Sequence, residues 1–246
     1  SLVPELTHYR IKDGRITSYN GRVAMSCKIA CDLDCVPKAE TFYKAIASCS
    51  ETVGLHLTAA GRLGVKSGKF KAFVDCLPTA TDQVEPEGET IANFDGEKLL
   101  AAIATAAPFI GSDASRPWCN GLLIEGNTAS ATNNIILVQV HTGLEFPISV
   151  NLPFAAVTEL LRIKKAPIAV QVTETSVTFH YEDDAWLKSQ LISSPWPNVN
   201  GMLDGECAPT TIDERLFECL PSLVPFIDQM GTVFLSGGGV STSLTE

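Results

Sequence analysis

A repeated order of helix, short strands, helix and short strands most limits the folds open to this chain. The most complete copy spans residues 94–203. It opens with an amphipathic helix in which Leu99 and Ile103 fall at helical spacing and Asp95 stands at the N-cap position. Short strands follow, with a turn at Gly126-Asn127. A second helix then starts at Leu152, with Pro153 in its first turn, and a second group of strands closes the copy. We therefore expect an α+β chain with antiparallel sheets.

Two offsets place the copies in one register. The helix that follows Pro37 matches the helix that follows Pro153, and these prolines are 116 residues apart. The predicted helix at 211–220 matches the one that opens at Asp95, and Asp95 and Asp213 are 118 residues apart. In this frame the first copy has no opening helix and the third stops after its first hairpin. We expect a chain truncated at both ends, with terminal segments that complete one another in an assembly as the alternative.

The repeat and the composition of the intervening segments predict the domain boundaries. A first domain occupies residues 1–78 and opens with hairpin turns at Asp13-Gly14 and Asn20-Gly21. A polar, proline-containing linker occupies 79–92. A complete second domain follows at 93–203, and 204–246 begin a third. With 45% hydrophobic and 19% charged residues, the chain is typical of a globular protein. No apolar run approaches the roughly 20 residues that span a bilayer.

Eight cysteines raise the question of a metal site or disulfides. Cys27, Cys31 and Cys35 are four residues apart, and the others are scattered. The paired short spacings of a zinc site, CxxC or HxxxH, do not occur. The pattern favours structural thiols in a reducing cytoplasm, with a metal or a disulfide as the alternative. We predict neither a metal nor a cofactor.

Catalytic motifs are also missing. The sequence contains no GxSxG, no Walker A loop and no GxGxxG that opens a helix. Asp183 and Asp184 are either a carboxylate pair or a solvated turn, and their place after a strand favours the turn. Gly237 to Gly239 lie between two predicted strands, as a hairpin turn does. The four histidines fall inside strand patterns: His8, His56, His141 and His180. We therefore do not expect an enzyme.

A series of short motifs carries a family resemblance, strongest over 94–203. They are Arg116-Pro117-Trp118-Cys119-Asn120-Gly121, Ala131-Thr132-Asn133-Asn134, the Pro153 helix, and Leu191-Ile192 to Pro197-Asn198. In this order they resemble the bacterial DNA polymerase III beta subunit, the sliding clamp, in a divergent, phage-like or prophage-like form. The resemblance implies repeated clamp domains, each with two helices packed on antiparallel sheets, that form a ring.

The resemblance also implies a DNA-facing surface. Rings of this family turn their helices toward the central hole, where sequence-independent phosphate contacts suffice. A net charge of −10 is unusual for a DNA-wrapping protein but acceptable for a ring with an acidic exterior. Solvated faces of amphipathic helices are the alternative for the basic residues, and a buried core ring is the alternative for Trp118. The predicted DNA-binding residues are Lys38, Lys44, Lys98, Arg116, Trp118, Arg162, Lys164, Lys165 and Arg215.

Family members recruit polymerases through a hydrophobic pocket that accepts a short linear peptide. The matching positions are Cys119, Thr132, Leu137, Pro197 and Met202. Asn134-Ile135-Ile136 replaces the family's Gly-His-Arg, which leads us to expect a more apolar peptide.

The resemblance thus predicts a cytoplasmic, non-catalytic processivity factor of DNA replication. Its partners would be double-stranded DNA, a polymerase and a clamp loader, and it would assemble as a homo-oligomer. Three domains per chain imply a dimeric ring and two imply a trimer. A non-DNA adaptor or scaffold built on the same fold is the alternative function.

Overall fold

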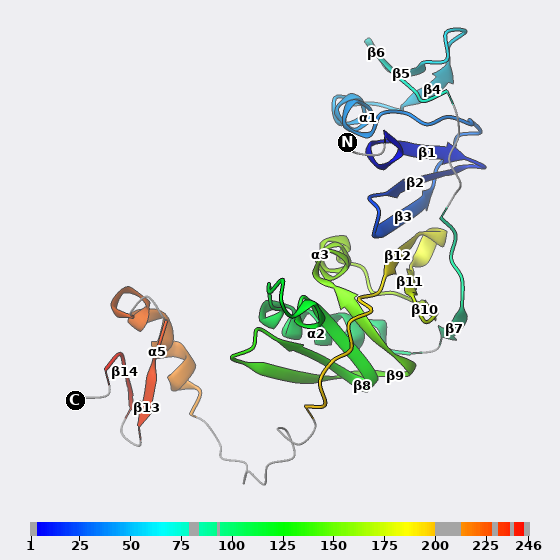
Figure 1. The fold of residues 1–246 in the computed structure, drawn as a ribbon. Coiled ribbons are helices and arrows are strands. Elements are labelled where there is room, and N and C mark those ends of the chain that lie inside the picture. Colours follow the sequence, from blue (N-terminus) through cyan, green and yellow to red (C-terminus); the bar gives the residue numbers. More distant parts are fainter. Residues whose placement is uncertain are drawn as a thin grey trace. The chain divides into compact units, whose positions relative to one another are not determined.

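The computed structural model describes residues 4–78, 84–92, 94–199, 213–227, 231–236 and 239–243. The chain divides into two compact units, Ser1–Trp196 and Pro197–Glu246. Helices and antiparallel strands occur in both units, so the fold class is α+β, as predicted (Figure 1).

The first repeat consists of a meander, one helix and a three-stranded sheet. Asp13 and Gly14 both have positive φ, at 50° and 69°, which is the geometry of the tight hairpin turn that Asp-Gly favours. This turn joins the first two strands of the meander. The elements are η1 (Pro4–Thr7), β1 (Tyr9–Lys12), β2 (Arg15–Tyr19), β3 (Val23–Lys28), α1 (Ala39–Ala47), β4 (Gly54–Leu57), β5 (Leu63–Ser67) and β6 (Phe70–Val74).

The second repeat has the expected order of helix, strands, helix and strands, and a short strand, β7, precedes it within the predicted linker. Its elements are β7 (Glu89–Ala92), α2 (Gly96–Ala106), η2 (Ala107–Phe109), η3 (Pro117–Cys119), β8 (Gly121–Thr132), β9 (Leu137–Pro153), α3 (Phe154–Ile163), β10 (Ala169–Val172), β11 (Ser176–His180), η4 (Glu182–Asp184) and β12 (Trp186–Gln190).

The sequence predicted the start of α2 correctly and the start of α3 too early. The Asp95 side chain accepts a hydrogen bond from the Lys98 amide at 2.9 Å, so the predicted N-cap is confirmed. The helix predicted from Leu152 instead begins at Phe154, and Pro153 is its N-cap rather than part of its first turn. Pro153 has a ψ of 146°, because Leu152 and Pro153 still pair with β8 as the end of β9.

The β8–β9 hairpin differs from the predicted run of short strands. We expected a turn at Gly126-Asn127, but β8 continues through it. Gly126 has a φ of 54°, and the pairing register shifts on both sides of it. Two steps along β8 match four steps along β9 from Ile124 to Gly126, and five from Gly126 to Thr128. The extra residues therefore lie in β9, and these irregularities interrupt the ladder without ending either strand.

A seven-stranded antiparallel sheet joins the two repeats. Its strand order is β1-β2-β3-β12-β11-β10-β7. The join is the β3–β12 pair, in which Leu187 lies opposite Met25. At the far edge β7 pairs with β10. Two further sheets, β4-β5-β6 and β8-β9, complete the first unit. The meander of one repeat thus continues the strand group of the next (Figure 1).

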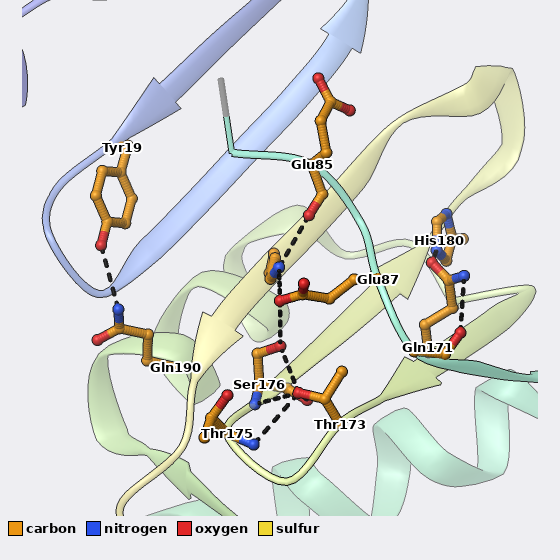
Figure 2. Close-up of polar contacts among 11 residues, drawn as sticks. Tyr19, Glu85, Glu87, Gln171, Thr173, Thr175, Ser176, His180 and Gln190 are labelled. Atoms are coloured by element: carbon orange, nitrogen blue, oxygen red, sulfur yellow. Dashed lines mark hydrogen bonds and ion pairs between the residues drawn. The ribbon is translucent and has the colours of Figure 1, made fainter. Parts of the chain in front are cut away.

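A polar network attaches the segment before β7 to this sheet. Lys188, with a side chain only 11% exposed, donates to the Glu85 carbonyl at 2.9 Å and to the Glu87 carboxylate at 2.6 Å. Ser176 donates to Glu87 and also contacts the Thr173 hydroxyl at 2.9 Å (Figure 2). Residues 84–88 are therefore held against the face of β11 and β12.

Each repeat has its own hydrophobic core. In the second repeat, Leu99 and Ile103 of α2 pack with Leu122 and Leu152 of the hairpin and with Phe179 of β11. The core of the first repeat consists of Ile11, Cys35, Phe42, Ala45, Leu63, Val65 and Val74. Leu99 and Ile103, which the helical spacing predicted as an apolar face, are thus both buried in the core of the second repeat.

The second unit contains a helix and a hairpin. Its elements are α5 (Arg215–Leu223), η5 (Val224–Phe226), β13 (Phe234–Ser236) and β14 (Gly239–Ser241). The two strands pair antiparallel, with Ser236 opposite Gly239. Gly237 and Gly238 of the predicted turn lie outside the described residues.

Candidate functional site

Three of the predicted pocket residues lie together where β8 ends and β9 begins. Leu137 is opposite Thr132 in the hairpin register. The Thr132 hydroxyl accepts from the Asn134 amide at 3.0 Å, and the Asn134 side chain reaches the Cys119 sulfur at 3.7 Å. Arg116 donates to the Asn134 side-chain oxygen at 3.1 Å. Asn134 therefore connects η3 to the hairpin end.

The cysteine of this group is inaccessible. Cys119 is fully buried and Thr132 is 7% exposed. A Cβ placed on Gly111 would lie 2.8 Å from the Cys119 sulfur and 3.1 Å from the Thr132 carbonyl, so only glycine allows this approach. The polypeptide after η2 thus covers Cys119, which contributes to the wall of the site through its packing.

The tip of the hairpin presents two isoleucines to solvent. The Asn133 side chain accepts hydrogen bonds from the amides of Ile135 and Ile136 at 3.0 and 2.9 Å. Asn134 has a left-handed φ of 71°, a conformation that Asn tolerates well. Ile135 is 88% exposed and Ile136 is 46% exposed. The turn is therefore defined by hydrogen bonds, and its surface is apolar.

Trp118 packs against a second indole. Its ring meets that of Trp196 edge to face, with centroids 5.1 Å apart. Trp118 is half-buried, and its carbonyl accepts from the Asn151 side chain at 2.9 Å. The two alternatives for Trp118 were a ring exposed for stacking on a DNA base and a ring buried in the core. A half-buried ring decides neither, so base stacking stays a prediction.

The remaining two pocket positions belong to the second unit. Pro197 is exposed and is the first residue of that unit. Met202 lies outside the described residues.

Four of the predicted DNA-binding cations already have acidic partners nearby in sequence. Lys44 contacts Glu40 at 2.6 Å, and Arg162 contacts Glu159 at 2.7 Å. The other two pairs are Arg116 with Asp113 and Arg215 with Asp213. All four cations are exposed. Such pairs are weak in water, so these side chains can exchange a carboxylate for a phosphate.

The other four cations are exposed and have no ion pair within the described part of the chain: Lys38, Lys98, Lys164 and Lys165. Lys164 and Lys165 are adjacent at the end of α3, where Lys164 is the C-cap with a φ of 55°. Cations at this end are favoured by the helix dipole. These two residues are the most compact pair of free positive charges among the predicted set.

The acidic turn at Asp183-Asp184 is a surface feature that links the repeats. Asp184 contacts Arg15 of β2 at 3.1 Å and Lys28 of β3 at 2.9 Å. Lys28 is the main cause that lowers the pKa of Asp184 below its ordinary value, and Arg15 adds to it. The predicted turn is thus present as η4, and Asp184 forms cross-repeat ion pairs rather than a carboxylate pair.

Sequence inspection missed a cavity beside η3. It has a volume of about 680 Å3 and is lined by Arg22 from the β2–β3 turn, Pro117, Phe154 at the start of α3, and Gln190 of β12. These residues come from four separate elements. Only the Asn20-Gly21 turn hinted that Arg22 is presented at a surface, and no local pattern connected it with α3.

Comparison with known proteins gives a result only at the level of structure, because no protein-family model and no curated sequence matches the chain. The DNA polymerase sliding clamp from Caulobacter crescentus has a TM-score of 0.76 at 17% identity, over 93% of this chain and 69% of that one. The sliding clamp from Bacillus subtilis has a TM-score of 0.75 at 18% identity, over 93% and 68%.

A third structure agrees with these two. The sliding clamp (DNA polymerase III subunit beta) from Pseudomonas aeruginosa, solved bound to griselimycin, has a TM-score of 0.74 at 16% identity, over 97% of this chain and 72% of that one. TM-scores of 0.74 to 0.76 over nearly the whole chain identify the fold. Because the sequence identities are only 16–18%, the likeness extends to the fold alone. The chain has the fold of sliding clamps.

The described part of the chain was searched for side chains that could hold a metal ion. No cluster of three or more His, Cys, Asp or Glu side chains there could hold an ion. The cysteines within the described ranges are free thiols, and Cys207 lies outside those ranges. Burial raises the pKa of Cys35 to about 12, so this thiol is protonated at neutral pH.

Two of the histidines contact the neighbouring strand of their sheet. His180 contacts Gln171 at 2.7 Å, and burial lowers its pKa (Figure 2). The ring of His56 lies over Gly64 on the neighbouring strand.

Among the described helices, none is long and apolar enough to span a membrane.

Proposed function

We propose that this chain is a DNA sliding clamp, a processivity factor that encircles duplex DNA and tethers a replicative polymerase. The observation that carries the proposal is the structural likeness to sliding clamps over 93% of the chain, with a TM-score of 0.76. The proposed clamp is a non-catalytic accessory subunit that works in the cytoplasm and assembles as a homo-oligomeric ring.

The distribution of charge supports sequence-independent contact with DNA. The exposed cations Lys164 and Lys165 follow α3, and Lys98 lies on the exposed side of α2. In the proposed ring these helices face the duplex. Weak phosphate contacts suffice there, because the closed ring and not the contact energy retains the protein on DNA. A net charge of −10 is compatible with that arrangement.

We propose that a polymerase and a clamp loader bind through short linear peptides at the hairpin end. Cys119, Thr132 and Leu137 are proposed to form the part of this site that the first unit supplies. The apolar tip at Ile135 and Ile136 favours a peptide with more apolar side chains than the common clamp-binding motif.

Retention on circular and linear DNA tests the function. We would measure the mass of the protein in solution and its retention on both DNA forms at moderate salt, with a clamp loader supplied. We expect a closed oligomer that stays on circles and slides off linear ends. A monomer with equal, weak retention on both forms would reject the clamp and favour the non-DNA adaptor.

A further inference from the structure

The cavity beside η3 is built by both repeats of the first unit. Arg22 comes from the β2–β3 turn of the first repeat, and the other residues that line the cavity come from the second repeat. Its volume of about 680 Å3 lies within the range of roughly 300–1,000 Å3 that is usual for small-ligand pockets. The cavity is therefore large enough for a small organic molecule.

Backbone hydrogen bonds hold the walls of this cavity in place. The Arg22 carbonyl accepts from the Gln190 amide at 2.9 Å, which ties the turn to the end of β12. The Arg22 amide in turn donates to the Asn20 side chain at 3.0 Å. On the other side, the Phe154 amide donates to the Asn120 carbonyl at 3.1 Å and joins α3 to η3. The cavity is thus preformed, so a ligand would not have to order its walls.

One wall of the cavity is apolar and open to solvent. Phe154 begins α3, yet its side chain is 55% exposed. Ile110, Pro117, Leu191 and Ile192 line the same cavity. A ligand with an apolar body would remove this surface from water, which is favourable.

The charge of the lining is positive, in contrast to the chain as a whole. The chain has 28 Asp and Glu residues and a net charge of −10, yet Arg22 is the one charged residue in the lining. Arg22 is exposed and forms no ion pair within the described residues. It also borders a smaller cavity that Glu87 lines, but the Glu87 carboxylate is already paired with Lys188 at 2.6 Å. The guanidinium is therefore available to an anion, and its fork of N–H donors matches a carboxylate or a phosphate.

We propose that the cavity beside η3 binds a small organic anion, with its carboxylate or phosphate group on Arg22 and its apolar body against Phe154. The hydroxyls of Ser112 and Ser193, which also line the cavity, can supply further donors to the anion. The inference goes beyond the proposed function, because none of these contacts depends on DNA or on a clamp-binding peptide.

Four aromatic probes of similar size test the charge that the cavity prefers. Phenyl phosphate, phenylacetate, neutral benzyl alcohol and cationic benzylamine would each be titrated into the 15N-labelled 246-residue chain, with amide chemical shifts as the readout. We expect the anions to bind with a dissociation constant of about 1 mM and to shift the amides of residues 110–112, 154–155 and 190–193. Benzyl alcohol and benzylamine should bind at least about tenfold more weakly. The tighter of the two anions identifies the natural group as a phosphate or as a carboxylate.

Three variants test the role of Arg22. Arg22→Gln removes the charge and should weaken binding of the tighter anion about tenfold, whereas Arg22→Lys keeps the charge and should weaken it less. Lys69→Gln is the matched control, because Lys69 is also exposed, forms no ion pair within the described ranges and lies outside the cavity. It should leave binding unchanged.

A fourth variant adds a charge in place of removing one. Ser112 is exposed, so Ser112→Glu should fold, and circular dichroism checks this for every variant. The new carboxylate should repel the anion and pair with Arg22, so we expect binding to weaken at least about tenfold. Equal affinity for phenyl phosphate, phenylacetate and benzyl alcohol would overturn the proposal. So would equal losses in Arg22→Gln and Lys69→Gln, or shifts confined to amides outside the cavity.

Discussion

At the residue scale, burial separates side chains that the sequence alone does not distinguish. Ile124 and Ile135 lie in the same hairpin, yet Ile124 is fully buried in the core and Ile135 is 88% exposed at the tip. Likewise, Arg10 is 8% exposed and bonded to Asp34, whereas all eight predicted DNA-binding cations are exposed. Residue type alone therefore does not predict how much a substitution changes the stability of the protein.

The two isoleucines give a matched test of this point. We expect Ile124→Ala to lower the free energy of unfolding by about 2–5 kcal/mol, because it removes buried methyl groups and leaves a cavity. Ile135→Ala should change it by less than about 0.5 kcal/mol. Urea unfolding followed by circular dichroism measures both. Similar losses in the two variants would show that the hairpin tip is buried in solution.

The Arg10–Asp34 pair predicts a pH dependence. The hydrogen bond from Arg10 is the main cause that lowers the pKa of Asp34 below its ordinary value of 3.8. The pair therefore stabilises the folded protein at pH values above 3.8, the ordinary pKa of Asp34. This stabilisation is lost as the pH falls through the lower pKa that Asp34 has in the folded protein. We expect Asp34→Asn to destabilise the protein at neutral pH and progressively less in acid.

Asp32→Asn is the control for this measurement, because Asp32 is exposed and forms no ion pair within the described residues. Urea unfolding of the native protein and both variants, at about pH 7 and at about pH 3, gives the comparison. A loss in Asp34→Asn that is the same at both pH values would contradict the prediction.

At the element scale, tertiary contacts decide how segments with weak local signals behave. Residues 84–92 are polar and were predicted as a linker, yet β7 within them pairs with β10. Hydrogen bonds from Lys188 hold the residues just before β7. The β8–β9 tip is another such segment, since Asn133 and Asn134 fix the turn that exposes Ile135.

Removal of the Lys188 ammonium should loosen residues 84–92. Lys188→Met keeps the aliphatic stem but leaves the Glu85 carbonyl and the Glu87 carboxylate without this donor. Without these hydrogen bonds the segment should open more often, so we expect the amides of 84–92 to exchange about tenfold faster. Hydrogen exchange with mass spectrometry measures this. Lys66→Met on β5 is the control, and an equal acceleration in both variants would count against the tether.

The hairpin tip predicts the peptide preference of the site. We expect the chain to bind the common clamp-binding motif about tenfold more weakly than a peptide with more apolar side chains. The combined change Asn134→Gly, Ile135→His and Ile136→Arg should reverse this order, because it introduces the residues of the family pattern. Fluorescence anisotropy with both peptides provides the measurement. Tight binding of the common motif by the unaltered chain would refute the prediction.

At the scale of the whole molecule, the seven-stranded sheet unites two repeats that have separate cores. The β3–β12 pair and the ion pairs of Asp184 with Arg15 and Lys28 all cross the boundary between them. In the proposed ring, this continuity would hold the basic ends of the helices at fixed positions around the duplex.

A charge variant separates phosphate contact from retention by the ring. With Lys164→Gln and Lys165→Gln together, affinity for a short linear duplex should fall, and the slope of log affinity against log salt should decrease by about 2, near 0.9 for each lost contact. Retention on loader-closed circles should be unchanged. The pair Lys66→Gln and Lys69→Gln serves as the control. An unchanged slope in the α3 variant would exclude these lysines from DNA contact.

Much of the fold was predictable because its signals are local. The Asp95 cap, the Asp13-Gly14 turn and the apolar stripe of α2 depend on neighbouring residues, and the structure confirms them. The start of α3 was predicted two residues early, because Leu152 and Pro153 are held in β9 by pairing with β8. In the candidate site, Cys119, Thr132 and Leu137 do lie together, whereas the cavity beside Arg22 was missed.

The sequence by itself determined the repeat, the order of its elements and the faces that fill each core, since helical and strand periodicity are properties of short stretches. Only the tertiary structure decided that β3 pairs with β12 and that residues 84–92 are bound to the sheet. Those pairings join residues between 77 and 166 positions apart. A strand edge carries no local mark of the partner strand that it meets.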